Sequence, residues 1–532
     1  MISKVIVQGY RKFRQLVFEP DPKMNIIIGD NEAGKSTLLE AIAMALSGRI
    51  DGRWANEDLN PYWFNTQLVS EYFSAYDANP RAVVPSIAVE VYLDSDDPDI
   101  QRMRGIHNFL RVDSPGVKLE VALNSEFEDE FDSYMADPGR PNVLPTEYFE
   151  ATWTDFNDMP LRRRPAGLGL SMIDSRTIRS RAGIDFHTRE ILASFLESKE
   201  RAAISVAHRK SRHQMTTSTL HSLNNKVREG SEVLHEAPLG LTMDQSANAS
   251  WEAGVIPQVN EIPFAMSGQG QQASIKVALA MKRRAESAQS VLIEEPETHL
   301  AHSRLQRLIQ RIETLAGGNQ QLFITTHSSF VLNRLGLNRL VFLRGDTTSR
   351  LTDLEKETVS YFKHLSGYDT LRLVLATKLV LVEGPSDEMI FKRGYFDKFQ
   401  KYPEADGIDV ISMNGITFKR ALELCMILDR EVVALQDNDG TPPSEILEGL
   451  GEYLAESRQM YVGDPKCGKT LEPQLVQANG VEGMRTILGL RPRDNLETWM
   501  RNHKTEGALR ILEATQDVVM PLYIQQAIEH FA

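Results

Sequence analysis

The sequence predicts an α/β protein in which two strand-and-helix units follow each other along the chain. In the first unit, the apolar run Met24–Ile28 leads through a glycine-containing loop into a helical pattern at Thr37–Leu46. From Leu379 onward, short apolar strands alternate with helical patterns, as in a parallel sheet. Residues 185–250 interrupt the first unit and have a helical pattern with few strand formers, so we predict a helical insertion there.

The composition is that of an ordinary globular chain with room for several domains. The chain has 532 residues, of which 42% are hydrophobic and 25% are charged, and about two to four domains are expected at this length. Its two cysteines, Cys425 and Cys467, are too few for a disulfide scaffold and suit a reducing cytoplasm. The longest apolar stretch, Leu371–Val382, is shorter than the roughly twenty residues of a membrane span. We therefore expect a cytoplasmic protein with no signal peptide and no membrane partner.

The charge of the chain is unevenly distributed. The formal net charge is −14, which by itself argues against a polyanionic partner. Residues 161–230, however, hold fourteen Lys or Arg against six Asp or Glu, including the cluster Arg209–His213. This local excess predicts either a surface that contacts the phosphate backbone of DNA, or a solvated helical face or subunit contact. The residues leave both interpretations open.

Strands are predicted throughout the first unit. Residues 2–9 alternate between apolar and polar side chains, and Ile87–Leu93 does so again. The stretch from about 94 to 160 is acidic and rich in prolines and aromatics, and we predict no order of elements for it. Strand patterns resume at Ile262, after the helical insertion. Three short buried strands are then predicted at Val291–Ile293, Leu322–Thr325 and Leu340–Leu343.

The second unit begins after a polar boundary at residues 344–356. Its expected elements are a strand at Leu379–Val382, a helix from Ser386, a strand at Val410–Met413, a helix at Thr417–Leu428 and a strand at Val432–Leu435. The tail from about 476 to 532 is predicted to be mostly helical. This order is typical of a parallel sheet with helices on its faces.

The loop after the strand Met24–Ile28 has the pattern of a phosphate-binding loop. Gly29–Ser36 matches G-x-x-x-x-G-K-[ST]. In such a loop the backbone N–H groups hold phosphates, Lys35 supplies a cation to the β- and γ-phosphates, and the Ser36 hydroxyl binds magnesium. The alternative is a chance match in a structural turn, and the strand-loop-helix context argues against it. The candidate nucleotide-binding residues are Asn31, Gly34, Lys35, Ser36 and Thr37.

Three later segments extend the nucleotide-binding interpretation. Glu294 and Glu295 end a predicted strand, where the first can hold magnesium and the second can orient or deprotonate an attacking water. His327 ends the next strand and is placed to sense the γ-phosphate. Ser267–Gly268 precedes a helix whose N-terminus can cap the phosphate of a second subunit. Singly, Glu294 fits a helix cap and His327 fits a buried strand-end histidine, but their order along the chain favours nucleotide chemistry.

A second group of candidate residues lies in the second α/β unit. Glu383 follows one predicted strand, and Asp437 and Asp439 follow another. Because parallel strands end at the same edge of a sheet, we expect these carboxylates and Asp387 to converge. The spacing of Asp437 and Asp439 places both side chains on one side if the strand stays extended. Clustered carboxylates suit Mg²⁺ or Mn²⁺, and two such ions could activate a water for attack on a phosphodiester.

These acidic residues also have structural interpretations. Glu383 with the following Gly-Pro fits a simple strand-to-helix turn, Asp387 fits a first-turn helix acid, and Asp437–Gly440 fits an Asx-rich turn. Their joint occurrence after two strands of one α/β unit favours the metal site over these alternatives.

The nucleotide-binding segments, taken in order, resemble ABC-type ATPases of the recombination-protein and SMC group. EEPETHL at Glu294–Leu300, followed by TTHS at Thr325–Ser328, is similar to the OLD (overcoming lysogenization defect) nucleases. The resemblance implies a homodimer or higher homo-oligomer in which ATP lies between Lys35 of one chain and Ser267–Gly268 of another. The sequence departs from the family pattern at SGQGQ, where ABC proteins usually have SGGQ or SGGE.

The acidic segments resemble the Toprim fold of topoisomerases, bacterial primases and OLD nucleases. Glu383 matches its first-strand glutamate, and Asp437–Asp439 matches its DxD motif. Similarity to the OLD nucleases implies Glu472 as another acidic ligand and Lys504 as the lysine that stabilises the scissile phosphate; a solvated helical lysine is the alternative for Lys504. The family includes the nuclease subunit of Gabija and nucleases that accompany retrons. A helicase, or a reverse transcriptase with its non-coding RNA, is therefore a candidate companion.

The resemblance covers nearly the whole chain and implies the following domains: 1–184 and 251–345 as two parts of an ABC-type ATPase, 185–250 as a helical dimerisation insertion, 346–375 as a linker, and 376–532 as a Toprim nuclease domain with C-terminal helices. The implied function is an ATP-regulated, Mg²⁺- or Mn²⁺-dependent DNA endonuclease in antiviral defence. The open alternative is a DNA-repair or condensation-type ATPase with a non-catalytic Toprim module.

The residues expected to act in catalysis are Glu295, His327, Glu383, Asp437, Asp439 and Lys504. Those expected to bind nucleotide also include Ser267, Gly268 and Glu294. Those expected to bind metal are Ser36, Glu294, Glu383, Asp387, Asp437, Asp439 and Glu472.

Overall fold

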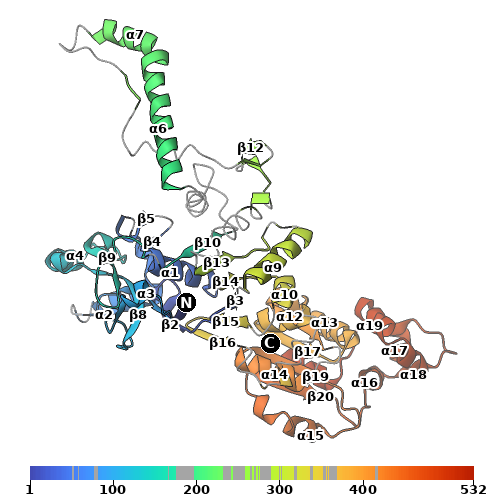
Figure 1. Cartoon of the computed structure of the whole chain (residues 1–532). Helices are drawn as coiled ribbons and strands as arrows, with labels where there is room; N and C mark the ends of the chain where they lie inside the picture. The colour runs from blue at the N-terminus through green and yellow to red at the C-terminus, as the bar shows by residue number, and fades with distance from the viewer. Residues whose placement is uncertain are drawn as a thin grey trace. The chain divides into compact units, whose positions relative to one another are not determined.

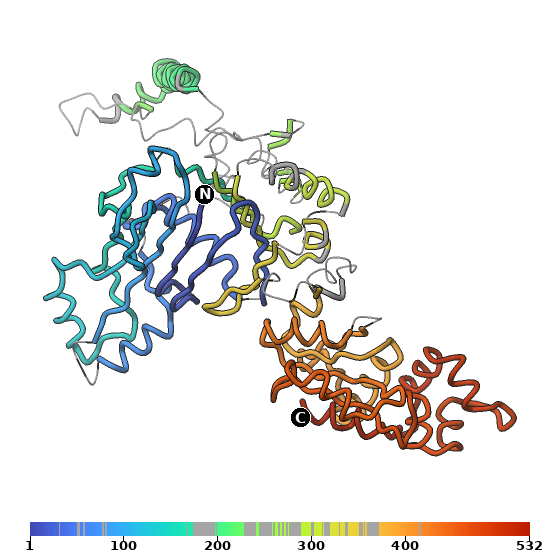
Figure 2. The backbone as a smooth tube through the Cα atoms, turned by 60° about the horizontal axis from the view of Figure 1, so that its bottom comes forward, coloured from blue at the N-terminus to red at the C-terminus, as the bar shows by residue number. Residues whose placement is uncertain are grey.

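The computed structural model has the mixed α/β architecture that the sequence predicts (Figure 1 and Figure 2). Contacts divide the chain into two compact units, one of Met1–Gln15, Glu19–Met24 and Ser36–Thr325, the other of Leu16–Phe18, Asn25–Lys35 and Thr326–Ala532. Among the described residues, no helix is both long enough and apolar enough to cross a membrane. The structure describes residues 1–30, 32–50, 53–57, 59–76, 79, 82–165, 167–174, 197–231, 241–243, 258–259, 261–263, 266–268, 271–272, 275, 289–298, 300, 302–316, 320–335, 339–350, 355, 357–358, 368–413 and 417–531.

An antiparallel sheet contains the amino-terminal strand and has the order β2-β1-β6-β8-β7, with β9 paired to β8. Its strands are β1 (Ile2–Tyr10), β2 (Phe13–Phe18), β6 (Ile87–Leu93), β7 (Arg104–Gly105), β8 (Ser114–Leu123) and β9 (Phe149–Asp155). The two strands predicted at residues 2–9 and 87–93 are therefore present, and Val5 lies opposite Val91. Strands β8 and β9 occupy the acidic stretch for which the sequence predicted no order.

A second six-stranded sheet has the order β10-β13-β14-β3-β15-β16. Its strands are β3 (Met24–Ile28), β10 (Leu170–Asp174), β13 (Ser290–Glu294), β14 (Gln321–Thr325), β15 (Leu340–Arg344) and β16 (Thr347–Arg350). β10, β13 and β14 pair in parallel, as do β3 and β15, and β16 returns antiparallel to β15. Strands β3, β13 and β14 are buried along their whole length, which explains their continuous apolar sequences.

Helices form the described part of the insertion. α6 (Ser198–Gln214) leads through a π-helix at Met215–Thr219 into α7 (His221–Ser231), drawn in green in Figure 1. The helical prediction for residues 185–250 is therefore confirmed over 198–231, whereas 185–196, 232–240 and 244–250 lie outside the described residues. A role of this segment in dimerisation stays a prediction.

A four-stranded parallel sheet with the order β18-β17-β19-β20 forms the core of the chain after residue 377. Its strands are β17 (Lys378–Val382), β18 (Ile408–Ser412), β19 (Glu431–Gln436) and β20 (Arg458–Val462). Leu381 pairs with Ile411 on one side and with Ala434 on the other, so β17 lies between β18 and β19. The predicted strands β17, β18 and β19 are confirmed, and β20 is an addition.

Helices pack on this sheet and cover its strands. α13 (Pro385–Phe399) contacts β17 and β18, and α20 (Leu522–Glu529) contacts β19 and β20. α12 (Tyr368–Leu375) packs with α14 (Phe418–Ile427), and these two helices contact β18 and β19, respectively. Strand β16 and helix α12 both lie within the residues predicted as a linker, so that segment contains regular structure.

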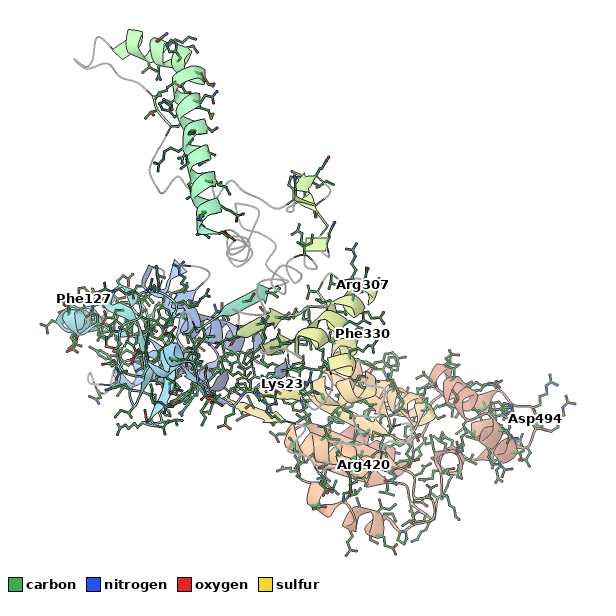
Figure 3. All side chains as sticks on the ribbon, viewed as in Figure 1. Lys23, Phe127, Arg307, Phe330, Arg420 and Asp494 are labelled. Carbon is green, nitrogen blue, oxygen red and sulfur yellow. The ribbon has the colours of Figure 1, made fainter. Side chains whose placement is uncertain are left out.

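The C-terminal tail is helical, as predicted, and α17, α18 and α19 lie together in both views (Figure 1 and Figure 2). Its helices before α20 are α16 (Leu471–Asn479), α17 (Val481–Leu488), α18 (Leu496–Asn502) and α19 (Lys504–Glu513). Asp494 lies in the turn between α17 and α18 and is labelled in Figure 3.

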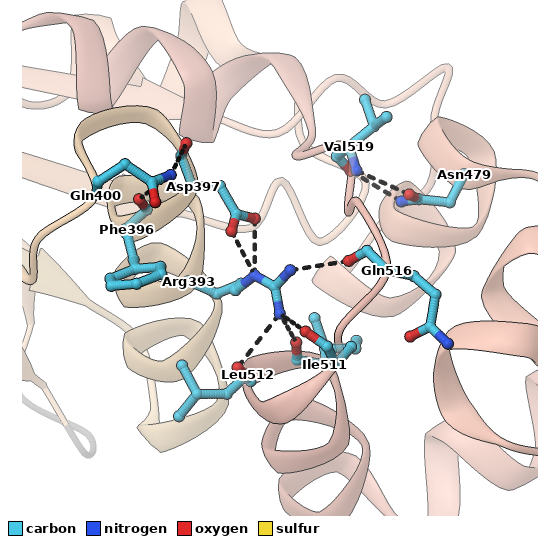
Figure 4. Close-up of polar contacts among 10 residues, drawn as sticks. Arg393, Phe396, Asp397, Gln400, Asn479, Ile511, Leu512, Gln516 and Val519 are labelled. Atoms are coloured by element: carbon cyan, nitrogen blue, oxygen red, sulfur yellow. Dashed lines mark hydrogen bonds and ion pairs between the residues drawn. The ribbon is translucent and has the colours of Figure 1, made fainter.

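Two neighbouring residues of α13 join this helix to the tail. Arg393 is 7% exposed and donates to the Asp397 carboxylate (2.7 Å) and to the carbonyls of Ile511 (3.0 Å) and Gln516 (2.9 Å), as Figure 4 shows. The next residue, Gly394, leaves no room for a side chain. A Cβ atom there would lie 2.7 Å from Cγ of Met520 and within 2.8 Å of the C-terminal helix.

Candidate functional site

The glycine-rich loop joins β3 to α1 (Lys35–Ser47) and holds its lysine through backbone oxygen atoms. Nζ of Lys35 donates to the carbonyls of Gly29 and Asp30, at 2.9 Å each, and the lysine is only 6% exposed. Gly34 has a φ of 99°, in the region that favours glycine. The first turn of α1 presents backbone N–H groups, which together with the ammonium group favour an anion.

The structure places four of the five predicted loop residues at the start of α1. Gly34 and Lys35 are buried, Ser36 is half-buried, and Thr37 is 8% exposed. Asn31 lies outside the described residues. The arrangement is that of a strand, a loop and a helix N-terminus, and the contact of each residue with nucleotide stays a prediction.

The paired glutamates lie at the end of β13, where the chain turns sharply. Glu294 is the last residue of the strand, pairs with Thr325 of β14 and is 2% exposed. Glu295 has a φ of 42°, and its N–H donates to the carbonyl of Thr325 at 3.0 Å. Its Oε2 atom accepts a hydrogen bond from the Thr298 hydroxyl at 3.3 Å. The left-handed conformation of a non-glycine residue here is the kind of strain that is concentrated at functional sites.

The remaining predicted nucleotide residues lie in loops. His327 is half-buried and follows β14 by two residues. The carbonyl of Gly268 accepts from the N–H groups of Gln271 (2.8 Å) and Gln272 (3.0 Å), and the Gln272 amide donates to the Ser267 carbonyl. Ser267 and Gly268 thus precede a turn of helical type, and their contact with a second chain stays a prediction.

The acidic residues of the four-stranded sheet meet at the carboxyl ends of neighbouring strands. Glu383 follows β17 and Asp437 follows β19, and these strands pair in parallel. The N–H of Asp437 donates to Oε1 of Glu383 at 2.9 Å. The chain passes from β17 to β18 on one side and then to β19 on the other, which makes this edge a topological switch point. Ligands of open α/β sheets bind at such points.

Asp437 is the most strongly perturbed carboxyl group at this edge. Burial raises its pKa, and the charges of Asp387 and Glu383 add to this, so that the pKa of Asp437 reaches about 8. Its Oδ2 atom accepts from the N–H of Leu471 at 3.2 Å. Its Oδ1 atom is buried and has no hydrogen-bond partner in the described part of the chain. An oxygen in this state can gain from a cation, because a buried acceptor without a partner is costly.

Two further acids share this environment. Burial, followed by the neighbouring acidic charges, raises the pKa values of both Glu383 and Asp387. Asp387 lies in the first turn of α13, and its Oδ2 atom accepts from the N–H of Gly384 at 3.0 Å. Tyr523 of α20 is 5% exposed, and its pKa is raised by burial and then by the charges of the same acids. The cluster is therefore bounded by a buried phenol that the sequence analysis did not identify.

The geometry expected for Asp439 is wrong. The sequence analysis assumed an extended strand through this residue, but β19 ends at Gln436, and Asp439 has a φ of 47°. Asn438 shapes the turn, because its amide donates to the carbonyls of Gly463 (3.1 Å) and Gly468 (2.7 Å) and accepts from the N–H of Gly440. Alternation along a strand therefore does not place the two aspartates, although the charge of Asp439 still raises the pKa of Glu383.

Glu472 and Lys504 form an ion pair beside the carboxylates. Nζ of Lys504 lies 3.1 Å from Oε1 of Glu472, whose other oxygen accepts from the Thr470 hydroxyl at 2.7 Å. Burial alone would lower the pKa of Lys504, but its hydrogen bond to Glu472 and the charges of Asp437 and Asp387 outweigh burial and raise it. These two residues, about 30 apart in sequence, thus lie together as the resemblance implied, and their roles stay predictions.

The donor set fits a hard divalent cation. Carboxylate oxygens predominate, burial and then mutual repulsion raise the pKa values of these carboxyl groups, and one Asp437 oxygen is buried without a donor among the described residues. In the same described residues, no three His, Cys, Asp or Glu side chains are already gathered at metal-binding distances. Like charges separate when no cation joins them, so binding would draw the carboxylates together.

The sequence analysis missed two residues beside these sites because both depend on long-range packing. Tyr523 is one of several apolar-face residues of α20, and nothing in its local sequence relates it to an acidic cluster about 85 residues earlier. Arg430 follows the end of α14 and contacts Asp30 of the glycine-rich loop, 400 residues away. A charged residue directly before an apolar strand was the available signal for Arg430.

Family models match three parts of the chain. An AAA-domain model matches residues 4–104. A second AAA-domain model, which carries the label of an AbiEii toxin from a type IV toxin–antitoxin system, matches residues 171–333. The model "Overcoming lysogenization defect protein-like, TOPRIM domain" matches residues 374–439, which contain Glu383 and Asp437.

Individual relatives match a short segment of the chain or have low sequence identity to it. The DNA replication and repair protein RecF of Idiomarina loihiensis is 44% identical over 48 residues, which is 9% of this chain and 14% of that protein. The C-terminal region of the Xanthomonas campestris OLD protein is 20% identical and covers 29% of this chain and 94% of that one, with a TM-score of 0.23. An SMC head bound to the C-terminal winged-helix domain of ScpA is 14% identical over 66% of this chain and 99% of that one, with a TM-score of 0.35.

The domain types of this chain follow from the family models and not from these low TM-scores. ATPase matches lie on both sides of the helical insertion, and the Toprim match lies on the sheet edge that holds the acidic cluster. ATPase domains with a Toprim domain suggest nucleotide binding, ATP hydrolysis and nuclease activity. The chain therefore has the domain combination of the OLD family, an AAA-type ATPase followed by an OLD-like Toprim domain.

Proposed function

We propose that this protein is an ATP-regulated, metal-dependent DNA endonuclease that cleaves phosphodiester bonds at the Toprim carboxylates. The observation that supports this most is the pairing of β17 with β19, which brings Glu383 and Asp437 to one sheet edge. The raised pKa values there indicate acidic groups that a divalent cation would stabilise in their ionised form.

Each residue at the Toprim edge has a defined role in this proposal. The residues that would hold Mg²⁺ or Mn²⁺ are Glu383, Asp387, Asp437, Asp439 and Glu472. When bound, such ions activate water and stabilise charge on a leaving oxygen. Lys504 is paired with Glu472 at 3.1 Å beside the cluster and would neutralise charge on the scissile phosphate.

The ATPase residues would control this site. Lys35 and the N-terminus of α1 would bind the triphosphate, and Ser36 and Glu294 its magnesium ion. Glu295 would orient the attacking water, and His327 would sense the γ-phosphate. Ser267–Gly268 would complete the nucleotide site of a second subunit in a homodimer.

The assembly and cellular role rest on the resemblance. The domain boundaries proposed for the ATPase parts, insertion, linker and Toprim domain are 1–184 with 251–345, 185–250, 346–375 and 376–532. DNA is the proposed macromolecular substrate, and antiviral defence in the cytoplasm is the proposed role. The comparisons give no support to a helicase or reverse-transcriptase companion.

A plasmid assay tests the nuclease. Wild-type protein with Mg²⁺ or Mn²⁺ is expected to nick or linearise plasmid DNA, and the Asp437→Ala/Asp439→Ala variant to lose on the order of 10²–10³-fold in rate. Asp464→Ala is a matched control, because Asp464 is an exposed aspartate in the loop after β20. Unchanged cutting by the double variant would exclude these carboxylates as the metal site.

One observation favours a second candidate, an ATPase with a non-catalytic Toprim module. No three potential ligands are gathered at metal-binding distances among the described residues. This candidate predicts ATP turnover that DNA stimulates and that Lys35→Ala abolishes, with no strand cleavage at any Mg²⁺ or Mn²⁺ concentration. Cleavage that is lost in the Asp437→Ala/Asp439→Ala variant excludes it.

A further inference from the structure

An ion pair joins the glycine-rich loop to the Toprim sheet, with the arginine buried and the Asp30 side chain 32% exposed. Asp30 is the second residue of the loop, Arg430 directly precedes β19, and both belong to the same compact unit. The two terminal nitrogens of Arg430 each lie 3.2 Å from one carboxylate oxygen of Asp30, and Arg430 is 6% exposed. This two-point geometry fixes the orientation of the loop on the strand as well as its distance.

Asp30 also contacts the residue that responds to nucleotide. Its carbonyl accepts from Nζ of Lys35 at 2.9 Å and from the N–H of Ala33 at 3.0 Å. A triphosphate draws the lysine of such a loop toward the β- and γ-phosphates. Nucleotide binding would therefore change the hydrogen bonds of Asp30, the residue whose carboxylate pairs with Arg430.

On the Toprim side, Arg430 directly precedes β19 and contacts α12, the helix that leads into β17. The Nη2 atom of Arg430 donates to the carbonyl of Val374 at 2.9 Å, shortly before β17. The two strands pair in parallel and end at Glu383 and Asp437. At about 3.3 Å per residue, the length of β19 separates Arg430 from Asp437 by about 20 Å.

The contacts of Arg430 differ from those of Arg393, a buried arginine of α13. All three nitrogens of Arg393 donate hydrogen bonds, four of its five acceptor residues being backbone carbonyls. Nε of Arg430 is buried and donates to nothing in the described part of the chain. A side chain placed only to support its surroundings would not leave a buried donor unused, so the position of Arg430 is set by the loop.

We propose that Arg430 is a positioning residue that couples the nucleotide loop to the Toprim carboxylates through β17 and β19. This inference rests on the proposed function, because it gives the route by which ATP controls the nuclease site. Arg430 neutralises Asp30 beside the phosphate site, so its loss leaves a carboxylate that repels a triphosphate. The loss of Arg430 also removes the ion pair that joins the loop to the start of β19, and with it this path between the two sites.

The test is the effect of nucleotide on Mn²⁺ affinity in the full-length protein. Mn²⁺ binding is measured by titration with and without a saturating Mg²⁺ complex of a non-hydrolysable ATP analogue, and Mn²⁺ binding that persists in the Asp437→Ala/Asp439→Ala variant is subtracted as binding outside the Toprim site. The ratio of the two dissociation constants then reports the coupling. Wild type is expected to give a ratio that differs from one by about fivefold or more. Arg430→Gln is expected to bring the ratio within about twofold of one, and Arg430→Lys, which keeps the charge, to restore part of it.

Two matched variants keep the test decisive. Asp30→Asn removes the charge of the other partner and is expected to bring the ratio within about twofold of one, as Arg430→Gln does. Because two variants test the same ion pair, the test survives if one of them does not fold. Arg344→Gln is the control, because the guanidinium of Arg344 pairs with Asp429 in the same turn at 2.6 Å and donates to the Leu428 carbonyl. This variant is expected to keep the wild-type ratio. The proposal is overturned if the ratio of the wild-type protein is near one. It is also overturned if Arg430→Gln or Asp30→Asn has the same ratio as the wild type.

Cleavage is scored separately, so the two proposals can fail independently. If wild type couples nucleotide to Mn²⁺ binding but cuts no DNA, the nuclease proposal fails and the coupling through Arg430 stands. If wild type cuts DNA and Arg430→Gln keeps the full ratio, the nuclease proposal stands and the role of Arg430 is excluded.

Discussion

The lysine of the nucleotide loop and the carboxylates of the Toprim cluster carry opposite charges, and the protein stabilises these charges differently. At the loop, the ammonium group of Lys35 has two carbonyl acceptors at 2.9 Å. At the cluster, burial and repulsion raise the pKa values of Glu383, Asp387 and Asp437. A nucleotide must therefore replace bonds that the loop already makes, whereas a cation relieves repulsion that is already present. At the loop, nucleotide binding exchanges one set of Lys35 hydrogen bonds for another, which favours a regulatory role. At the Toprim cluster, the repulsion favours strong binding of a metal ion.

The largest effect is expected where the loop loses its cation. Lys35→Ala removes the charge that neutralises the β- and γ-phosphates and should lower ATP turnover on the order of 10³-fold. Phosphate release under saturating ATP measures this. Lys12→Ala provides a control lysine in the same ATPase sequence match, outside the loop. Turnover within about tenfold of wild type would show that the loop does not bind the phosphates as proposed.

A smaller effect is expected for the cation beside the carboxylates. Lys504→Met should slow plasmid cleavage about a hundredfold, because Lys504 is the positive charge placed near the scissile phosphate. Lys398→Met is the matched control, since Lys398 forms a comparable ion pair with Glu529 at 3.2 Å away from the cluster. Equal rates in the two variants would contradict a role for Lys504 in charge stabilisation.

The smallest effect is expected for the pH dependence of protein stability, in the part of it that comes from the acidic cluster. The pKa of Asp437 is raised to about 8, so the folded protein keeps a proton there that the unfolded chain loses near pH 4. Without metal, the contribution of Asp437 to the free energy of unfolding is therefore complete below about pH 4. This contribution falls as the pH rises toward 8.

Thermal unfolding measures this dependence. With EDTA, the melting temperature should fall by a few degrees, on the order of 2–4 °C, between pH 5 and pH 8. Asp437→Asn should lose this part of the dependence, and Mn²⁺ should restore the melting temperature of the wild type at pH 8. A melting temperature that rises over this range in wild type but not in Asp437→Asn would reverse the sign and exclude the assignment.

The sequence predicted those parts of the site that depend on local patterns. Glu383 and Asp437 were placed together because each follows an apolar strand, and parallel strands share an edge; β17 and β19 pair as expected. The glycine-rich loop was predicted because its pattern fits between a strand and a helix, and α1 begins at Lys35. Period and motif are local properties of the chain, so the sequence alone contains them.

Other features depend on contacts that no local pattern describes. Asp439 leaves the extended conformation because Asn438 is held by carbonyls about 25–30 residues later. Arg430 meets Asp30 across 400 residues. The strands β8 and β9 form in an acidic stretch, because burial against neighbouring strands outweighs weak propensity. In each case tertiary packing decides the structure.

The close approach at Gly394 has an evolutionary consequence. A Cβ atom at this position would lie 2.7 Å from Met520 and 2.8 Å from Ile528. A side chain at position 394 therefore requires the Met520 and Ile528 side chains to shift or to be replaced by smaller ones. We expect lineages that replace Gly394 to carry smaller side chains at 520 and 528. Among such sequences, position 394 should thus record how the last helix has moved over α13, the helix that also carries Asp387.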